Sequence, residues 1–179
     1  MFKKILLILA AIVAIFVIVV ATRPSDFKVE RTRVIAATPG QIFPHVNDLH
    51  LWQAWSPWAK LDPTAKNTFA GPPAGKDSSL HWAGDSNVGE GTMTIIESVP
   101  TQQVRYRLDF KKPFEGTNIA EFNLTPEGPS TRVVWSMTGK CNFVTKAIGL
   151  FVSMDQMVGD QFSKGLDDLA KIAEAGKKS

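Results

Sequence analysis

Three side chains in this sequence are candidates for acid–base chemistry in apolar surroundings. Tyr106 is the only tyrosine, and Glu97 is in phase with Met93 and Ile95 in an alternating segment. Asp155 lies one position away from an apolar helical stripe. A phenol paired with a carboxyl group can donate and accept protons, as a cyclase or an isomerase requires. The alternative is that the carboxylates support the fold or lie on the surface, and both interpretations are compatible with the sequence.

The histidines and the single cysteine do not form a recognisable catalytic or metal-binding set. His45, His50 and His81 show neither the HxH nor the HxxxH spacing of metal ligands. Cys141 has no neighbouring base to activate it, and one cysteine excludes an internal disulfide and a four-cysteine zinc site. We therefore expect neither a metal nor a cofactor.

Aromatic and apolar side chains are the stronger candidates for a binding site. Trp52, Trp55 and Trp58 recur every three residues, a spacing that suits either a gate at a pocket or the packing of a short helix onto a sheet. With the residues expected to face a long helix, the candidate ligand contacts are Trp55, Trp58, Trp82, Tyr106, Leu108, Phe122, Trp135, Met137, Phe151 and Met154. The alternative is a filled core, since pockets and cores share an apolar composition.

Alternation of apolar and polar residues predicts the strands that would carry these side chains. Short turns join most of them, which indicates an antiparallel meander. The predicted strands cover residues 27–37, 78–83, 89–99, 103–110, 114–124 and 131–140. Residues 59–79 are rich in proline and glycine, and they predict a long loop with at most one short strand, at residues 67–69.

Helices are predicted on both sides of this strand series. Thr38-Pro39 begins one that runs to about Val46, and a second short helix covers residues 49–55. Apolar residues at three- and four-residue spacing predict a long helix over residues 151–172, with an earlier turn of the same helix at 146–150. The result is an α+β fold in which a curved antiparallel sheet of about six to seven strands wraps the long C-terminal helix and can leave a cavity.

The N-terminal segment predicts a membrane helix or a signal peptide. Every residue from Ile5 to Ala21 is apolar, and this run is longer than the apolar part of a usual signal peptide. We therefore interpret residues 1–23 as a retained single transmembrane anchor of the domain 24–179, with a cleaved signal peptide as the alternative. Because two lysines and an apolar run resemble an export signal, we expect the N-terminus in the cytoplasm and the domain outside, in the periplasm.

The charge of the chain is concentrated beside the apolar run. The sequence has 20 Lys and Arg against 17 Asp and Glu, and Lys3, Lys4 and Arg23 account for the difference. The domain that follows is therefore neutral. A neutral domain argues against nucleic-acid binding, which requires a basic face.

Several motifs resemble those of a known superfamily. They are Trp52-x-x-Trp55-Ser56-Pro57-Trp58, Asp62-Pro63, Gly71-Pro72, Trp82-x-Gly84, Gly89-x-Gly91-x-Met93 and Met154-Asp155-x-Met157-x-Gly159-x-x-Phe162-x-x-Gly165-Leu166-x-x-Leu169. With the element order, they resemble the START-like (SRPBCC) superfamily, and most closely its bacterial polyketide cyclase/dehydrase-like branch with an N-terminal membrane segment. The resemblance covers about residues 27–175 and implies the helix-grip (START/Bet v 1-like) fold. It implies no catalytic positions, because binders, carriers and enzymes share this scaffold.

Three functions are compatible with these features. The first is a membrane-tethered module that binds a hydrophobic small molecule or lipid between the sheet and the C-terminal helix, with residues 5–21 in the membrane. The second is a cyclase, aromatase or isomerase that acts on an apolar polyketide-like substrate through Tyr106, Glu97 or Asp155. The third is a partner-binding domain with a filled core. We expect the first, and more generally a protein that is not an enzyme.

Overall fold

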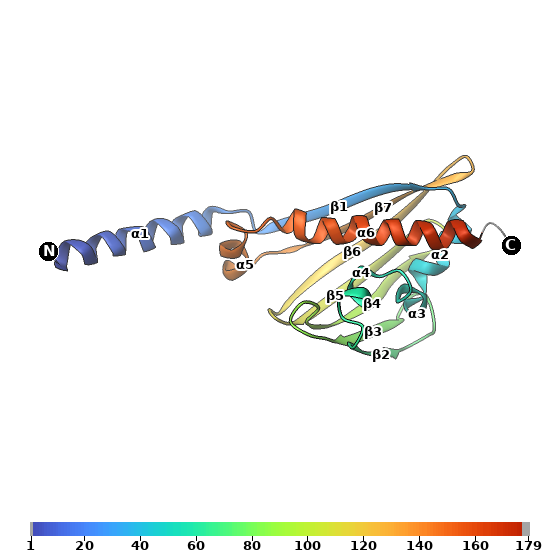
Figure 1. Cartoon of the computed structure of the whole chain (residues 1–179), viewed down its shortest axis with the longest axis horizontal. Helices are drawn as coiled ribbons and strands as arrows, with labels where there is room; N and C mark the ends of the chain where they lie inside the picture. Colours follow the sequence, from blue (N-terminus) through green and yellow to red (C-terminus); the bar gives the residue numbers. More distant parts are fainter. Residues whose placement is uncertain (1, 177–179) are drawn as a thin grey trace.

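A curved antiparallel sheet carries the fold of the computed structural model, which describes residues 2–176 (Figure 1). In this described part, seven strands lie in the order β1-β7-β6-β5-β4-β3-β2, and each pair of neighbours is antiparallel. The strands are β1 (Asp26–Ile35), β2 (Lys66–Ala70), β3 (Ser79–Ala83), β4 (Glu90–Val99), β5 (Gln103–Lys112), β6 (Gly116–Glu127) and β7 (Ser130–Lys140). Only the β1–β7 pairing joins strands distant in sequence, so the predicted meander is confirmed.

The long helix α6 (Met154–Ala175) packs across one face of this sheet (Figure 1). Its buried residues recur at helical spacing and include Phe162, Leu166 and Leu169, so the apolar stripe of the sequence is the face that meets the sheet. The α+β helix-grip expectation is confirmed. The helix begins at Met154 rather than at residue 151, because Ser153 caps it by accepting a hydrogen bond from the backbone N–H of Gln156 at 3.2 Å.

Short helices fill the connection between β1 and β2. They are α2 (Pro39–Asn47), α3 (Leu49–Trp52) and α4 (Pro57–Leu61). The predicted helix over residues 49–55 is therefore too long, and α4 lies across the start of a segment predicted as loop. Proline at the first position of α4 explains the division, because proline starts a helix well but cannot continue one.

The segment before α6 also differs from the expectation. Residues 143–148 form a separate helix, α5 (Phe143–Ile148), and not a first turn of α6. Asn142 caps α5 by accepting a hydrogen bond from the backbone N–H of Thr145 at 2.9 Å, and the chain turns at Gly149. This break allows α5 and α6 to point in different directions.

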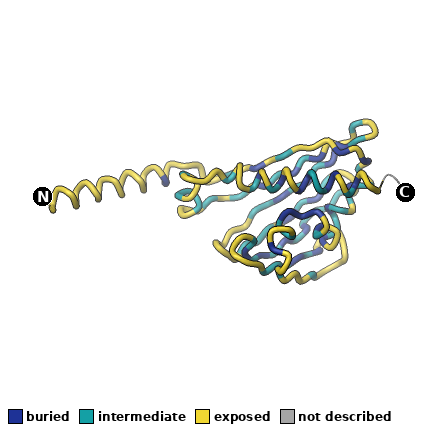
Figure 2. The backbone as a smooth tube through the Cα atoms, viewed as in Figure 1, coloured by how far each residue is buried: buried dark blue, intermediate teal, exposed yellow. Residues whose placement is uncertain are grey.

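Helix α1 (Phe2–Thr22) projects away from the rest of the molecule (Figures 1 and 2). It is long and apolar enough to cross a membrane, a property that signal sequences share. Its side chains are exposed except for Val20, which is buried near the end of the helix, and α1 contacts α5. The main hydrophobic core lies between the sheet and helices α2, α3 and α6, and it contains no residue of α1.

Candidate functional site

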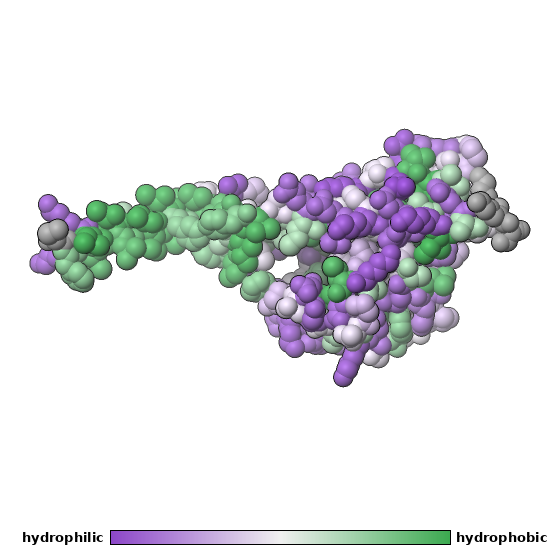
Figure 3. Space-filling model, in the orientation of Figure 1, coloured by the Kyte–Doolittle hydropathy of each residue, from purple (hydrophilic) through white to green (hydrophobic). Residues whose placement is uncertain are grey.

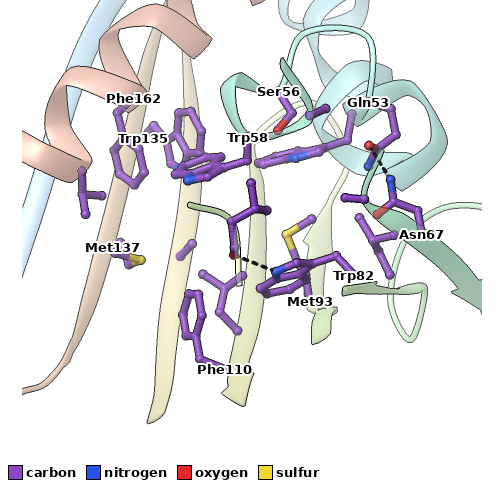
Figure 4. Close-up of a pocket in the computed structure, with 18 residues that line it drawn as sticks. Gln53, Ser56, Trp58, Asn67, Trp82, Met93, Phe110, Trp135, Met137 and Phe162 are labelled. Atoms are coloured by element: carbon purple, nitrogen blue, oxygen red, sulfur yellow. Dashed lines mark hydrogen bonds between the residues drawn. The ribbon is translucent and has the colours of Figure 1, made fainter. Parts of the chain in front are cut away.

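An apolar cavity of about 210 Å³ lies between the sheet, the α3–α4 segment and α6 (Figure 4). For scale, an engineered protein cavity of about 150 Å³ lined by aliphatic and aromatic groups holds benzene. The helical segment contributes Trp52, Gln53, Ser56, Trp58, Ala59 and Ala65 to the wall, and α6 contributes Val158 and Phe162. The sheet and its turns contribute Asn67, Leu80, Trp82, Val88, Met93, Leu108, Phe110, Ala120, Trp135 and Met137.

Stacked aromatic rings form one end of the cavity. The ring of Trp135 lies parallel to that of Phe162, with 4.0 Å between the centroids and 6° between the planes. Its other aromatic neighbours include Phe122, stacked at 4.7 Å, and Trp58, edge-on at 5.6 Å. Aromatic pairs in these arrangements are favourable beyond the area they bury. This wall is therefore preorganised, and it presents flat apolar surfaces to the cavity (Figure 4).

Polar groups at the cavity are few and uncharged. The amide of Asn67 donates to Gln53 Oε1 at 3.2 Å, and Trp82 Nε1 donates to the backbone oxygen of Val88 at 3.2 Å (Figure 4). The remaining non-aromatic polar side chain of the wall is that of Ser56. Among the described residues that line it, none carries an ionisable side chain. Such a wall favours an apolar molecule and provides no acid or base.

One hydrogen-bond donor beside the cavity has no partner. The indole nitrogen of Trp135 is buried, and within residues 2–176 no group accepts its proton. A buried donor without an acceptor costs free energy, so such groups are rare in proteins. Trp135 is also a wall residue, but its nitrogen atom is itself buried and is not exposed to the cavity.

A hydrogen-bonded loop closes the cavity beside Ala65 and Val88. The carboxylate of Asp62 accepts from the hydroxyl and the backbone N–H of Thr64, at 2.6 and 2.9 Å, and from the backbone N–H of Asp85 at 2.8 Å. These bonds, led by that of the Thr64 hydroxyl, lower the pKa of Asp62. They hold the segment after α4 against the turn between β3 and β4. The space-filling view is hollowed below α6, between α5 and this part of the molecule (Figure 3).

Residues 26–174 match the protein family described as polyketide cyclase / dehydrase and lipid transport. The chain belongs to this family. The match covers the whole sheet and nearly all of α6, and α1 lies outside it. The sequence-based assignment to the polyketide cyclase/dehydrase (SRPBCC) group is thereby confirmed, and the apolar cavity lies inside the family domain.

Solved structures confirm the fold of this polyketide cyclase/dehydrase family domain. Protein CV1439 from Chromobacterium violaceum has a TM-score of 0.61 at 15% identity, over 82% of this chain and 96% of that one. The Aha1 dimer from Colwellia psychrerythraea gives 0.60 at 15% identity, over 84% and 98%. Ara h 8.0201 gives 0.53 at 10% identity, over 84% and 96%. At such identities the likeness concerns the fold alone, and no curated protein matches the chain.

The ten ligand-contact candidates divide evenly between the cavity wall and other places. Those on the wall are Trp58, Trp82, Leu108, Trp135 and Met137. Trp55, Tyr106 and Phe122 are fully buried behind the wall, and Trp55 Nε1 donates to the backbone oxygen of His45 at 3.0 Å. Met154 packs against the core, whereas Phe151 is 81% exposed and lies outside the cavity.

The three acid–base candidates lie apart from one another and away from the cavity. Tyr106 donates its hydroxyl proton to the backbone oxygen of Val46, and burial raises the pKa of the phenol. Asp155 accepts from Arg31 Nη1 at 3.0 Å on the surface, and this bond lowers the pKa of Asp155. These two side chains are engaged in positioning elements of the fold.

Glu97 does not share the face of Met93 and Ile95 as alternation predicted. A register shift between Ile95 and Glu97 interrupts the pairing of β4 with β5. After such a bulge the strand presents its side chains on the opposite faces. Glu97 therefore forms an ion pair with Arg105 at 2.9 Å.

Sequence reasoning missed most of the remaining wall residues. Phe110 was in phase with the selected Leu108, so alternation alone could have included it. Gln53 and Asn67 carried no such signal. They meet only because α3 and β2, which are separated by a loop and α4, lie side by side in the fold.

Proposed function

We propose that this domain is a membrane-tethered module that binds a hydrophobic small molecule or lipid between the sheet and α6. The observation that carries the proposal is the cavity of about 210 Å³, whose wall is aromatic and aliphatic and has no ionisable side chain among the described residues. Binding pockets are typically apolar with a few polar groups that orient the ligand. The description of the family, which includes lipid transport, supports the same class of ligand.

The size and chemistry of the cavity limit which hydrophobic molecules can bind in it. A volume somewhat above that of a benzene-binding cavity suits a fused aromatic ring system or one medium-length acyl chain better than a two-chain lipid. Flat rings can pack against Trp58 and against the edge of Trp135, whose two faces are covered by Phe122 and Phe162.

The tether in this proposal is α1. Residues 5–21 of α1 are apolar, and all of these except Val20 are exposed, as expected for a helix that crosses a bilayer. We place the N-terminus in the cytoplasm and the domain in the periplasm, with a cleaved signal peptide as the competing reading of the same helix. A tether of this kind keeps the cavity close to a reservoir of apolar molecules.

The proposal does not extend to cyclase or isomerase chemistry. Such a reaction requires an acid or base within hydrogen-bond reach of the substrate. Tyr106, Glu97 and Asp155 are each bonded elsewhere in the fold. A partner-binding domain with a filled core is likewise not favoured, because the space between sheet and helix is open.

The test is ligand occupancy of residues 24–179, which contain the whole main core. We expect native mass spectrometry of the purified domain, or of the domain after incubation with fatty acids and quinones, to show a bound apolar molecule. Replacing Leu108 on the wall by tryptophan (Leu108→Trp) fills the cavity, so we expect at least a tenfold loss of affinity. The matched control is Val34→Trp, an exposed apolar position on β1, which should bind as the wild type does.

The domain must remain folded for this comparison, and circular dichroism and thermal unfolding check that for each variant. A domain that binds nothing from the panel and shows no thermal stabilisation would contradict the proposal. Equal binding by the Leu108→Trp and wild-type domains would place the ligand outside the cavity.

A further inference from the structure

We propose that the surface formed by α5 and the turn into α6 lies in the headgroup layer of the bilayer, beside the point where α1 enters it. We call this surface the α5 patch. It consists of Phe143, Val144, Ile148, Phe151, Val152 and Met157. The inference rests on the tether of the proposed function, since α1 brings the patch to the membrane.

The α5 patch gathers large apolar side chains that the domain leaves in water. Phe151 is 81% exposed and Met157 is 55% exposed, and the other members are each close to half exposed. Elsewhere on the described part of the domain, the exposed large apolar residues are Val34, Leu51, Leu61 and Phe114, which belong to separate elements. Single exposed apolar residues are ordinary, whereas a contiguous group indicates an interaction surface.

The position of the patch selects a bilayer as its partner. Helix α1 contacts α5, and Val20, near the end of α1 that adjoins the domain, is fully buried. Figures 1 and 3 show α5 next to the end of α1, so that the apolar surface of α1 continues onto the domain. When α1 crosses the bilayer, α5 therefore lies where the helix leaves it.

The backbone of the patch is built to hold these side chains outward. The backbone N–H groups of Phe151 and Val152 both donate to the oxygen of Ile148, at 2.9 and 3.0 Å. The backbone N–H of Gly149 donates to the oxygen of Thr145 at 2.9 Å where α5 ends, and Ser153 caps α6, so the turn between the two helices is hydrogen-bonded at both ends. Phe151 is therefore exposed because the hydrogen-bonded backbone of this turn holds its side chain outward.

Charges near the patch suit a lipid surface. Arg23 follows α1, and Lys140 and Lys146 flank the start of α5. Within residues 2–176 these three side chains form no ion pair with an acidic residue. Basic side chains beside apolar ones reach the phosphates of the headgroups while their stems stay in apolar surroundings.

The patch also adjoins the cavity. Met157 belongs to the α5 patch, and the next residue of α6, Val158, lines the cavity. The hollow below α6 lies close to α5 in Figure 3. A patch seated in the bilayer therefore places the α6 end of the cavity at the lipid surface, where an apolar ligand can pass between membrane and protein.

The test measures the depth of single nitroxide labels on the full chain in vesicles of phosphatidylcholine and phosphatidylglycerol. Labels are attached at Ile148→Cys and Phe151→Cys in a Cys141→Ser background. Ile12→Cys is the reference inside α1, and Val34→Cys is the matched exposed apolar position on the far part of β1. Collisions with oxygen relative to a water-soluble nickel chelate report the depth of each label.

We expect the labels at 148 and 151 to lie roughly 5–10 Å into the interface, the depth of interfacial helices. Their oxygen-to-nickel ratio should be several-fold above that at 34 and below that at 12. If the labels at 148 and 151 lie in the interface while the label at 12 is in water, the patch binds lipid and only the α1 tether is refuted. Water-like values at 148 and 151 overturn the inference. Shielding from both reagents with spin–spin broadening also overturns it, in favour of a second copy of the chain.

Discussion

At Gly165 the backbone of α6 lies close to the aromatic wall of the cavity. A methyl group at this position would lie 2.8 Å from Cζ3 of Trp135 and 3.1 Å from Cδ of Pro57. Neither neighbour can move easily, because the Trp135 ring is stacked between Phe122 and Phe162 and Pro57 begins α4. The absence of a side chain is therefore what allows the helix to seat on the wall.

We predict that Gly165→Ala destabilises the domain in spite of the higher helix propensity of alanine. Overpacking of a rigid core costs about 1–3 kcal/mol, and the propensity gain offsets at most about 1 kcal/mol of it. The control is Gly40→Ala in α2, where an added methyl group meets no atom within 4 Å and should be neutral or stabilising. Chemical denaturation of the two variants measures the difference. If the Gly165→Ala domain is as stable as the control, the aromatic wall can shift to make room for the added methyl group.

Asp62 gives the closing loop a dependence on pH. Hydrogen bonds from Thr64 and the backbone of Asp85 lower its pKa in the folded state, whereas the unfolded carboxyl titrates near its ordinary value of about 4. A depressed folded-state pKa contributes stability that is fully present above the unfolded pKa and is lost as the pH falls through the folded pKa. The loop is therefore weakened by acid.

The variant Asp62→Asn should be less stable than the wild type at neutral pH. Its amide can accept from Thr64 through oxygen, but it presents a donor to the N–H of Asp85, which also donates. We expect the difference in melting temperature between wild type and variant to stay constant above about pH 5 and to shrink below about pH 4. Thermal unfolding over this range measures it. A difference that does not change with pH would rule out the titration of Asp62 as its origin.

At the scale of the elements, the first turn of α6 is tied to β1 through Arg31. Its guanidinium donates to the carboxylate of Asp155 at 3.0 and 3.1 Å and to the backbone oxygen of Asp155 at 2.9 Å. The group lies against Gly159, where an added methyl group would be 2.0 Å from its Nη2 atom. Arg31 thus occupies the space that a side chain at residue 159 would take.

We predict that Arg31→Ala loosens the start of α6 without unfolding the domain. Hydrogen exchange of the backbone amides of residues 155–160 should accelerate, because that turn loses its link to β1, while the exchange of the central strands stays unchanged. Arg33→Ala is the matched control, since Arg33 pairs with Asp167 in the middle of the same helix. Acceleration of the same amides in both variants would show that the effect is not specific to the Arg31 link.

The elements that the sequence predicted well are those with long and regular periodicity. Strands β5 to β7 and helix α6 bury one face over part of their length, and each was found within a few residues of its observed bounds. Helix α4 was missed because five residues give too short a period to recognise. Glu97 was assigned to the wrong face of the sheet because a β-bulge reverses the alternation of side chains, and no residue pattern in the sequence indicates the bulge.

At the scale of the whole molecule, the cavity depends on relations that no single segment contains. Phe122 and Leu108 both face α6 from neighbouring strands, yet one is buried behind the wall and the other lines it. The difference arises from where α3 and α4 rest on the sheet, and alternation does not specify that position. Cores and pockets share one composition, so sequence could supply the aromatic candidates but not their division between the two.

Helix α1 and the folded domain are structurally separate parts of the chain. Because the main core contains no residue of α1, removing residues 1–23 should leave the fold and its thermal stability nearly unchanged. Retention of α1 as an anchor requires the full chain to remain in bacterial membranes after carbonate washing, with the mass of all 179 residues. Intact mass spectrometry of the membrane and soluble fractions measures this. A shortened chain in the periplasmic extract would identify α1 as a cleaved signal peptide, and the domain would then meet its ligand without a tether.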